Sequence, residues 1–264
     1  MPLRSTRTAS DAPNAEAHLR CGRRELERII VHVLVLQHIA CEPPGVYEDV
    51  LRERGATIHC VELDEDDPLP DWRGFEAIIS MGGPMSVNDE ERLPWLRDEK
   101  ALINDAVRAG VPFFGACLGA QLLSASLGGI VFQGPKPEVG LLPVFLTPEA
   151  ASDPVFRGIP REMLTFQWHG DTFSLPSGSV LLASSPAFPH QAFRWGARAY
   201  GVQFHLEVSI DMAREWLQVP EYAKSLNDCL GPGSAATLID KFGKHEGRLR
   251  GQGRRLFERW LDLR

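Results

Sequence analysis

The stretch Val111-Pro112-Phe113-Phe114-Gly115-Ala116-Cys117-Leu118-Gly119 decides how this chain folds. Its apolar first part, Val111 to Phe114, predicts a short buried strand, and a helix is expected from Ala120 to Leu127. A cysteine flanked by glycines at such a strand-to-helix turn is typical of a nucleophile elbow, where small neighbours let a strained backbone hold the side chain over the sheet edge. The pattern therefore places Cys117 at the edge of an α/β sheet.

Strand-like runs rich in Val, Ile and Phe alternate with helical patterns before this stretch. The predicted strands are Ile29–Leu36, Thr57–Leu63 and Phe75–Ser80, and the predicted helices are Val46–Arg54 and Asp98–Ala109. Such alternation is the signature of a parallel sheet with crossover helices. After residue 130 the predicted strands follow one another closely, at Leu141–Leu146, Met163–Trp168, Val180–Ser184, Gln191–Trp195 and Tyr200–Phe204. We therefore expect an antiparallel or mixed extension of the sheet, followed by a helix at about Ser209–Leu217.

The length of 264 residues, 44% of them hydrophobic, suffices for one sizeable core, which we assign to a single domain over residues 29–220. Residues 1–28 carry arginines and no apolar run of the secretory kind, so a disordered leader is expected there. Residues 221–264 are expected to form a helical C-terminal appendage, in which Leu249, Leu256, Trp260 and Leu263 lie near one face. That face predicts docking on the core or binding of a partner, and contact with nucleic acid or anionic lipid is a third, weaker interpretation.

Composition narrows the classes of function. The net charge is −7, and it becomes −14 when the basic segments 1–28 and 241–264 are set aside. An acidic body binds polyanions poorly, so nucleic acid is not an expected partner. The five cysteines are scattered and form no C-x-x-C pair, which argues against a disulfide framework or a metal site and favours the reducing cytoplasm. No apolar run is long enough to span a membrane, and neither a phosphate loop nor a credible dinucleotide motif predicts a cofactor.

Cys117 is the candidate nucleophile. Its sulfur would meet the N-terminus of a helix, a position that lowers the pKa of a thiol and favours the thiolate. The backbone N–H of Leu118 is then free to point at a developing oxyanion. The alternative is that Cys117 is a small buried core residue, as most free cysteines are.

A second element, Gly201-Val202-Gln203-Phe204-His205-Leu206-Glu207, supplies a base and a group to orient it. An extended chain places His205 and Glu207 on the same side, so the imidazole can take a thiol proton while the carboxylate fixes its tautomer. A third element, Gly82-Gly83-Pro84, ends a predicted strand, where glycines allow an N–H to be aimed at a substrate carbonyl. Taken singly, His-x-Glu is more often a surface pair and Gly-Gly-Pro a plain turn.

Together these elements resemble the class I glutamine amidotransferases, in particular stand-alone proteins similar to the amidotransferase domain of GMP synthase. The resemblance covers roughly residues 29 to 217, and its most specific pieces are Gly82 to Val87, Gly115 to Gln121, Gln167 to Asp171 and Gly201 to Glu207. It implies a flavodoxin-like, mostly parallel sheet with helices on both faces. It also implies that Cys117 attacks the glutamine carboxamide, with His205 and Glu207 completing a triad and Gly83 and Leu118 forming the oxyanion hole.

For the substrate, the resemblance implies that Gln121 helps to hold the glutamine, near Gly82, and that the loop of Trp168, His169 and Gly170 closes over its amino-acid end. His169 is equally well interpreted as a structural histidine. Leu206 stands where the family usually has proline, which puts local rigidity in doubt more than the chemistry.

Three functions remain open: an ammonia-donating subunit for a separate synthase, a free-standing hydrolase of γ-glutamyl amides or peptides, and a non-catalytic binding or regulatory module.

Overall fold

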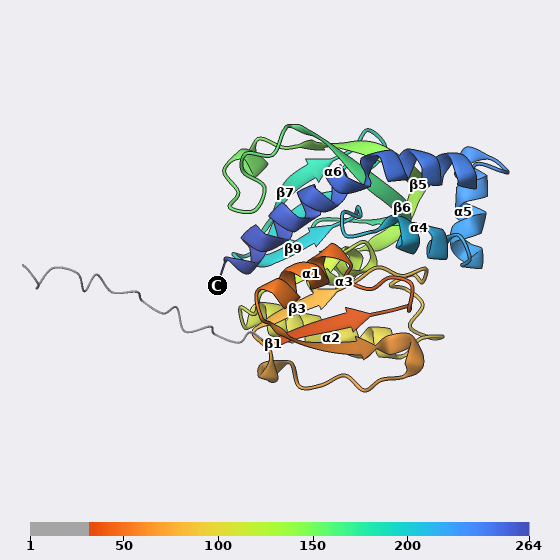
Figure 1. Ribbon diagram of the computed structural model, residues 1–264. Coiled ribbons are helices and arrows are strands. Elements are labelled where there is room, and N and C mark those ends of the chain that lie inside the picture. The colour runs from red at the N-terminus through yellow and green to blue at the C-terminus, as the bar shows by residue number, and fades with distance from the viewer. Residues whose placement is uncertain (1–31, 264) are drawn as a thin grey trace, which may run out of the picture.

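A computed structural model describes residues 32–263 of the chain, so the predicted leader and the first three residues of the strand expected at 29–36 lie outside the described residues. A nine-stranded sheet organises the described part, with the strand order β2-β1-β3-β4-β9-β8-β7-β5-β6 (Figure 1). Strands β2, β1, β3, β4 and β9 run parallel, and β8, β7, β5 and β6 extend the sheet in antiparallel fashion. The α/β architecture predicted from the alternating pattern is therefore confirmed.

The parallel strands are β1 (His32–Gln37), β2 (Thr57–Glu62), β3 (Ala77–Ser80), β4 (Phe113–Ala116) and β9 (Ala199–Val202). The antiparallel strands are β5 (Val131–Leu146), β6 (Glu162–Phe173), β7 (Ser179–Ser184) and β8 (Ala192–Trp195). The helices are α1 (Val46–Glu53), α2 (Trp95–Arg108), α3 (Leu118–Ser126), α4 (Ile210–Trp216), α5 (Pro220–Leu230) and α6 (Ala235–Leu261). Short 3-10 turns lie at Leu63–Glu65, Trp72–Gly74 and Glu149–Ala151.

Strands β5 and β6 are much longer than the sequence predicts. The expected strand at 141–146 is only the end of β5, which begins ten residues earlier, at Val131. This early part contains Pro135 and Pro137, and proline cannot donate to a strand ladder. They are accommodated in a register irregularity between Gln133 and Glu138, where β5 pairs only with β6.

Helix ends also differ modestly from the prediction. Helix α2 begins three residues before the predicted Asp98, because Pro94 holds a helical φ of −60° and starts the turn. Helix α4 matches the prediction closely, since the side chain of Ser209 caps it by accepting a hydrogen bond from the Met212 N–H.

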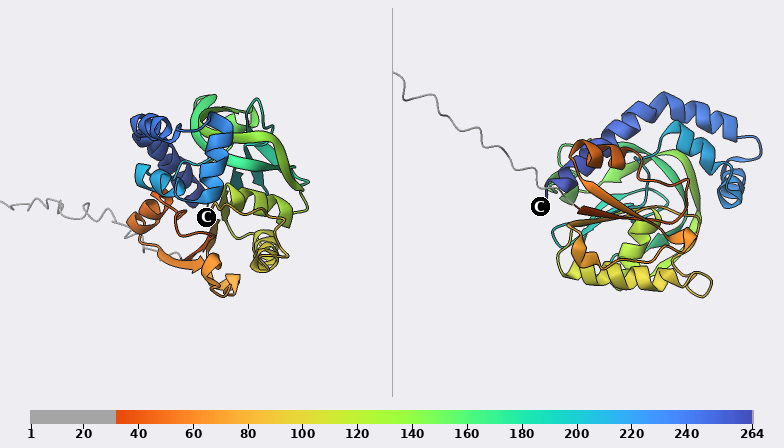
Figure 2. Two further views of the ribbon diagram at one scale, coloured as in Figure 1. Left: turned by 90° about the vertical axis from the view of Figure 1, so that its right-hand side faces the viewer. Right: turned by 60° about the horizontal axis from the view of Figure 1, so that its bottom comes forward.

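Helices cover both faces of the sheet because successive residues of β1 point to opposite sides. Leu34 and Leu36 join an apolar cluster with α2 and α3, whereas Val33 and Val35 join a cluster with α1, α4 and α6. Figure 2 shows α2 and α6 on opposite sides of the sheet. The carboxyl ends of the parallel strands, with the turns that follow them, lie between these two layers.

The C-terminal segment is part of this core. Phe242, Leu249, Leu256, Phe257 and Trp260 of α6 are each no more than 1% exposed and contact the same apolar cluster as α1. The apolar face predicted for the C-terminal segment is therefore docked on the core and is not free to bind a partner. The predicted domain boundary at residue 220 stays a prediction. Residues 221–263, predicted as an appendage, pack on the core of the domain.

Helix α6 also braces the strand end that carries His205 and Glu207. A Cβ at Gly253 would lie 2.6 Å from the Leu206 carbonyl oxygen, so only glycine allows this close approach. Arg250 donates to the Glu207 carbonyl oxygen at 3.4 Å. Among residues 32–263, no helix is long and apolar enough to cross a membrane.

Candidate active site

Cys117 occupies a strained turn between β4 and α3. Its φ of +50° and ψ of −104° lie outside the regions that non-glycine residues favour, which is the backbone geometry expected of a nucleophile elbow. The flanking glycines are sterically required: a Cβ at Gly115 would lie 2.4 Å from the Gly119 backbone, and a Cβ at Gly119 would lie 2.0 Å from the Ser80 carbonyl oxygen. The Cys117 N–H donates to the Val202 carbonyl oxygen at 2.8 Å, which ties the turn to β9.

His205 and Glu207 follow β9 and lie beside Cys117. The Nδ1 atom of His205 is 2.6 Å from Oε1 of Glu207, and the second carboxylate oxygen accepts the Leu206 N–H at 2.9 Å. Glu207 and His205 are 0% and 1% exposed, so water does not compete for these contacts. The orienting carboxylate fixes the proton on Nδ1 and leaves Nε2 for the sulfur.

The electrostatics of the pair differ from the sequence-based expectation. Burial raises the pKa of the Cys117 thiol above its ordinary value, and the nearby His205 acts in the opposite direction, by charge and by hydrogen bond. Burial alone would lower the pKa of His205, but Glu207 and Cys117 raise it well above its ordinary value. Among the groups that act on the thiol, the positive charge and hydrogen bond of His205 are what favour the thiolate.

Gln203, for which the sequence predicts no role, contacts the same sulfur. Its side-chain amide donates to Cys117 Sγ at 3.5 Å, while its carbonyl oxygen accepts from Gln121 Nε2 at 3.2 Å. Gln203 is 0% exposed. A second donor to the sulfur helps to offset the loss of water around a thiolate.

The two expected oxyanion donors are neighbours. A Cβ at Gly83 would lie 3.1 Å from a methyl carbon of Leu118, and Gly83 lines the same pocket as Cys117. Leu118 is the first residue of α3, and the first N–H groups of a helix have no partner within it. Gly83 and Leu118 are thus adjacent, beside the pocket that opens at Cys117.

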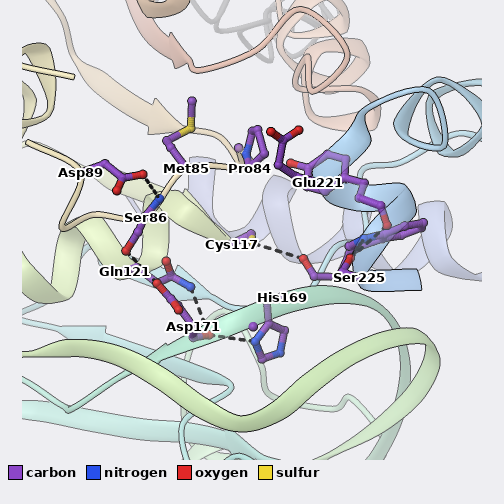
Figure 3. Close-up of a pocket in the computed structure, with 14 residues that line it drawn as sticks. Pro84, Met85, Ser86, Asp89, Cys117, Gln121, His169, Asp171, Glu221 and Ser225 are labelled. Carbon is purple, nitrogen blue, oxygen red and sulfur yellow. Dashed lines mark hydrogen bonds between the residues drawn. The ribbon is translucent and has the colours of Figure 1, made fainter. Parts of the chain in front are cut away.

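A pocket of about 310 Å³ opens at Cys117 (Figure 3). One wall comes from the turn after β3, from Gly83 to Asp89, and another from β6, from Trp168 to Asp171. The third comes from α5, through Glu221, Tyr222 and Ser225. Three carboxylates, Asp89, Asp171 and Glu221, line the pocket, and none of the described residues around it is a lysine or an arginine.

Four of the five predicted substrate-binding residues line this pocket. Gln121 is held by Gln203 and by the Asp171 carbonyl oxygen, and the Trp168 carbonyl oxygen lies 3.9 Å from the Cys117 sulfur. His169 and Gly170 line the pocket as well. Gly82 is not among the lining residues and instead lies behind the wall.

His169 has clear structural partners. Its Nδ1 donates to the Asp171 carbonyl oxygen at 2.9 Å, and Nε2 lies 3.4 Å from the buried Glu138 carboxylate. The ring also contacts Phe188 edge-on. These contacts hold the β6 wall in place, in keeping with a structural role.

The α5 wall was not foreseen. Trp168 donates its indole N–H to Ser225 at 2.8 Å, and the Tyr222 hydroxyl donates to the buried carboxylate of Glu42. Burial raises the pKa of Glu42, and its second oxygen has no hydrogen-bond partner in the described structure. Glu42 follows β1 at the carboxyl edge of the sheet, where polar residues signal a site, and this signal was overlooked.

Within residues 32–263 no group of three or more His, Cys, Asp or Glu side chains is arranged to hold a metal ion.

Comparison with known proteins identifies the family. Residues 46–218 match the family model described as glutamine amidotransferase class-I. The chain belongs to the class I glutamine amidotransferases. The matched range contains Cys117, His205 and Glu207, and the expected resemblance is thus confirmed at the level of the family.

Individual amidotransferase relatives agree with this assignment. The glutamine amidotransferase-like protein YfeJ of Salmonella typhimurium is 32% identical over 192 residues, which are 71% of this chain and 80% of that protein. A GMP synthase subunit of Sulfolobus acidocaldarius is 34% identical over 154 residues, 57% of this chain and 77% of its own length. The match to GMP synthase of Streptomyces avermitilis, 37% identical over 134 residues, covers half of this chain but only 24% of the synthase.

Solved amidotransferase structures share the fold. A glutamine amidotransferase from Thermotoga maritima superposes with a TM-score of 0.79 at 30% identity, covering 88% of this chain and 98% of its own. A second, from Methylobacillus flagellatus, gives a TM-score of 0.80 at 31% identity, covering 89% and 95%. Both coverages reach well beyond residues 46–218.

Proposed function

We propose that this protein hydrolyses the side-chain amide of glutamine through Cys117, His205 and Glu207, giving ammonia and glutamate. The observation that carries the proposal is one buried arrangement of a strained cysteine, a histidine that lowers the pKa of its thiol by charge and hydrogen bond, and a carboxylate 2.6 Å from that histidine. A structural cysteine needs neither the strained backbone nor the oriented base.

In the proposed reaction, the Cys117 thiolate attacks the carboxamide carbon, and the electron pair of the C=O bond moves to its oxygen. The N–H groups of Gly83 and Leu118 stabilise this oxyanion. His205, protonated by the thiol, gives its proton to the departing nitrogen, so ammonia leaves and a glutamyl thioester forms. Water, deprotonated by the same histidine, then releases glutamate and restores the thiol.

The names of the relatives suggest what receives the ammonia. The similarity to one subunit of a GMP synthase supports a role as the ammonia-donating partner of a separate synthase. A hydrolase of γ-glutamyl amides is the second candidate. Glutamine brings one cationic group, its α-ammonium, whereas three carboxylates line the pocket, which favours a γ-glutamyl amide whose amine part carries a second cation.

The test is release of glutamate from glutamine and, separately, from γ-glutamyl amides with neutral and with cationic amine groups. Cys117→Ala serves as the control for contaminating activity. Turnover of glutamine supports the first candidate, and turnover of cationic amides alone supports the second. If the control is as active as the wild type on every substrate, the proposed triad is wrong.

A further inference from the structure

A buried histidine lies behind the oxyanion hole, outside the proposed triad. His38, just after β1, is 0% exposed, and its Nδ1 is 3.2 Å from the Gly82 carbonyl oxygen. Its Nε2 lies 3.0 and 3.1 Å from the two carboxylate oxygens of Glu99, on α2. Glu99 is also 0% exposed and accepts the Ser80 hydroxyl at 3.0 Å. No motif in the sequence indicates that these residues meet.

The partners fix the protonation of the ring. A backbone carbonyl can only accept a hydrogen bond, so Nδ1 must carry a proton. An ionised Glu99 carboxylate can likewise only accept, so it requires a proton on Nε2 as well. With Glu99 ionised, the buried His38 ring is an imidazolium with both N–H groups used, and it stacks on Trp95 with ring centroids 5.7 Å apart. In agreement, Glu99 and Gly82 raise the pKa of His38 against the lowering effect of burial, and Glu42 adds a smaller contribution of the same sign.

The carbonyl that His38 holds belongs to the peptide unit that carries the Gly83 N–H. Residues 32–263 contain no cis peptide bond, and in a trans peptide the C=O and N–H point in opposite directions. Because the Gly82 carbonyl is anchored toward the buried ring, the Gly83 N–H faces the other way, toward the pocket that Gly83 lines. A cation on the carbonyl also polarises the peptide and makes its N–H a stronger donor.

We propose that the buried His38–Glu99 pair is a positioning device, which holds the Gly82–Gly83 peptide and strengthens its N–H as an oxyanion donor. This inference rests on the proposed function for its catalytic consequence. Glycine at both positions fits the arrangement: a Cβ at Gly82 would lie 1.9 Å from Glu42 Oε2, and one at Gly83 would lie 3.0 Å from His38 Cβ. Gly83 can thus lie directly against His38, while Gly82 lies against Glu42.

Three full-length variants test the device. His38→Phe removes both hydrogen bonds, Glu99→Gln removes the charge while keeping the shape, and His38→Asn retains one neutral donor near the Gly82 carbonyl. The exposed His59, on β2, provides the matched control His59→Asn. For each protein, kcat and KM for the hydrolysed substrate are measured beside the rate at which iodoacetamide alkylates Cys117, a reaction that builds no oxyanion.

For His38→Phe we expect kcat to fall roughly 10- to 100-fold, less than the about 10²- to 10³-fold that loss of a whole oxyanion donor costs. KM and the alkylation rate should change less than about twofold, and His38→Asn should recover part of kcat. Wild-type kcat in both His38→Phe and Glu99→Gln would overturn the inference. So would a loss of kcat matched by an equal loss of alkylation rate, because that would indicate general damage.

A measurement independent of turnover separates this inference from the proposed function. In nitrogen-15 NMR spectra of the wild-type protein, the His38 ring should show two protonated nitrogens at neutral pH, and Glu99→Gln should shift the Gly83 amide resonance. A neutral His38 ring, or an unmoved Gly83 resonance, would refute the device even if glutamine is hydrolysed. The expected spectra without hydrolysis of any γ-glutamyl substrate would leave the device standing and refute the proposed function instead.

Discussion

Two glycines in one helix allow the contact between α6 and the proposed triad to be tested. At Gly251 no atom of the described residues lies within 4 Å of the position where a Cβ would be, whereas a Cβ at Gly253 would lie 2.6 Å from the Leu206 carbonyl oxygen and 2.9 Å from its Cβ. Exchanging glycine for alanine inside a helix stabilises a protein by about 1 kcal/mol when space permits. We therefore expect Gly251→Ala to raise the free energy of unfolding by about 1 kcal/mol.

Gly253→Ala gains the same helix propensity but forces two backbones apart. Carbon contacts are optimal at about 3.5–4 Å, so α6 or the Leu206 backbone must move by about 1 Å. Overpacking of this kind costs about 1–3 kcal/mol, and this is the difference expected between the two variants in urea denaturation. Because Leu206 lies between His205 and Glu207, a displacement of about 1 Å should also lower kcat roughly 10- to 100-fold in Gly253→Ala alone.

The control for this comparison is built in, since both substitutions add the same methyl group to the same helix. Equal free energies of unfolding for the two variants, or equal kcat values, would refute the conclusion that α6 braces the strand end that carries His205 and Glu207.

Three further predictions address the site itself. His205→Gln removes the group that lowers the pKa of the Cys117 thiol, so the pH–rate profile of Cys117 alkylation, followed by peptide mass spectrometry, should move to higher pH. The alkylation rate at pH 7 should fall about tenfold for every pH unit by which the profile moves. An unmoved profile would contradict the pairing of His205 with Cys117. Glu207→Gln leaves the imidazole without its orienting charge and should reduce kcat roughly 10²- to 10⁴-fold with the fold intact, whereas a loss under about fivefold would speak against a triad. Ser225→Ala leaves the buried Trp168 N–H without a partner and should lower the free energy of unfolding by about 1–3 kcal/mol, and an unchanged urea midpoint would show that α5 does not hold this wall.

Much of the fold could be predicted because strands, helices and tight turns depend mainly on residues that are close together in the sequence. The strand-to-helix turn at Cys117 follows from residues that are adjacent in the chain, and β1, α1 and α4 were expected within a few residues of where they lie. The early part of β5 escaped prediction because its prolines are tolerated only through an irregular pairing with β6, which is a contact made in space.

The same distinction applies to the site. Cys117, His205 and Glu207 lie in short motifs that predict a nucleophile and an oriented base. His38 and Glu99 are 61 residues apart, and Tyr222 and Glu42 are 180 apart, so only the folded chain brings each pair together. The raised pKa of the Cys117 thiol could not be foreseen either, since it depends on a burial that the motif does not reveal.

If the proposed triad hydrolyses glutamine, Cys117 carries the glutamyl group as a thioester during turnover. The most direct measurement is acid quenching of the protein a short time after mixing with glutamine or the preferred γ-glutamyl amide, followed by peptide mass spectrometry. We expect a peptide containing Cys117 to gain the mass of a glutamyl thioester, and this gain to be absent in Cys117→Ala. Release of glutamate by the wild type with no adduct on Cys117, or with undiminished release by Cys117→Ala, would contradict the account.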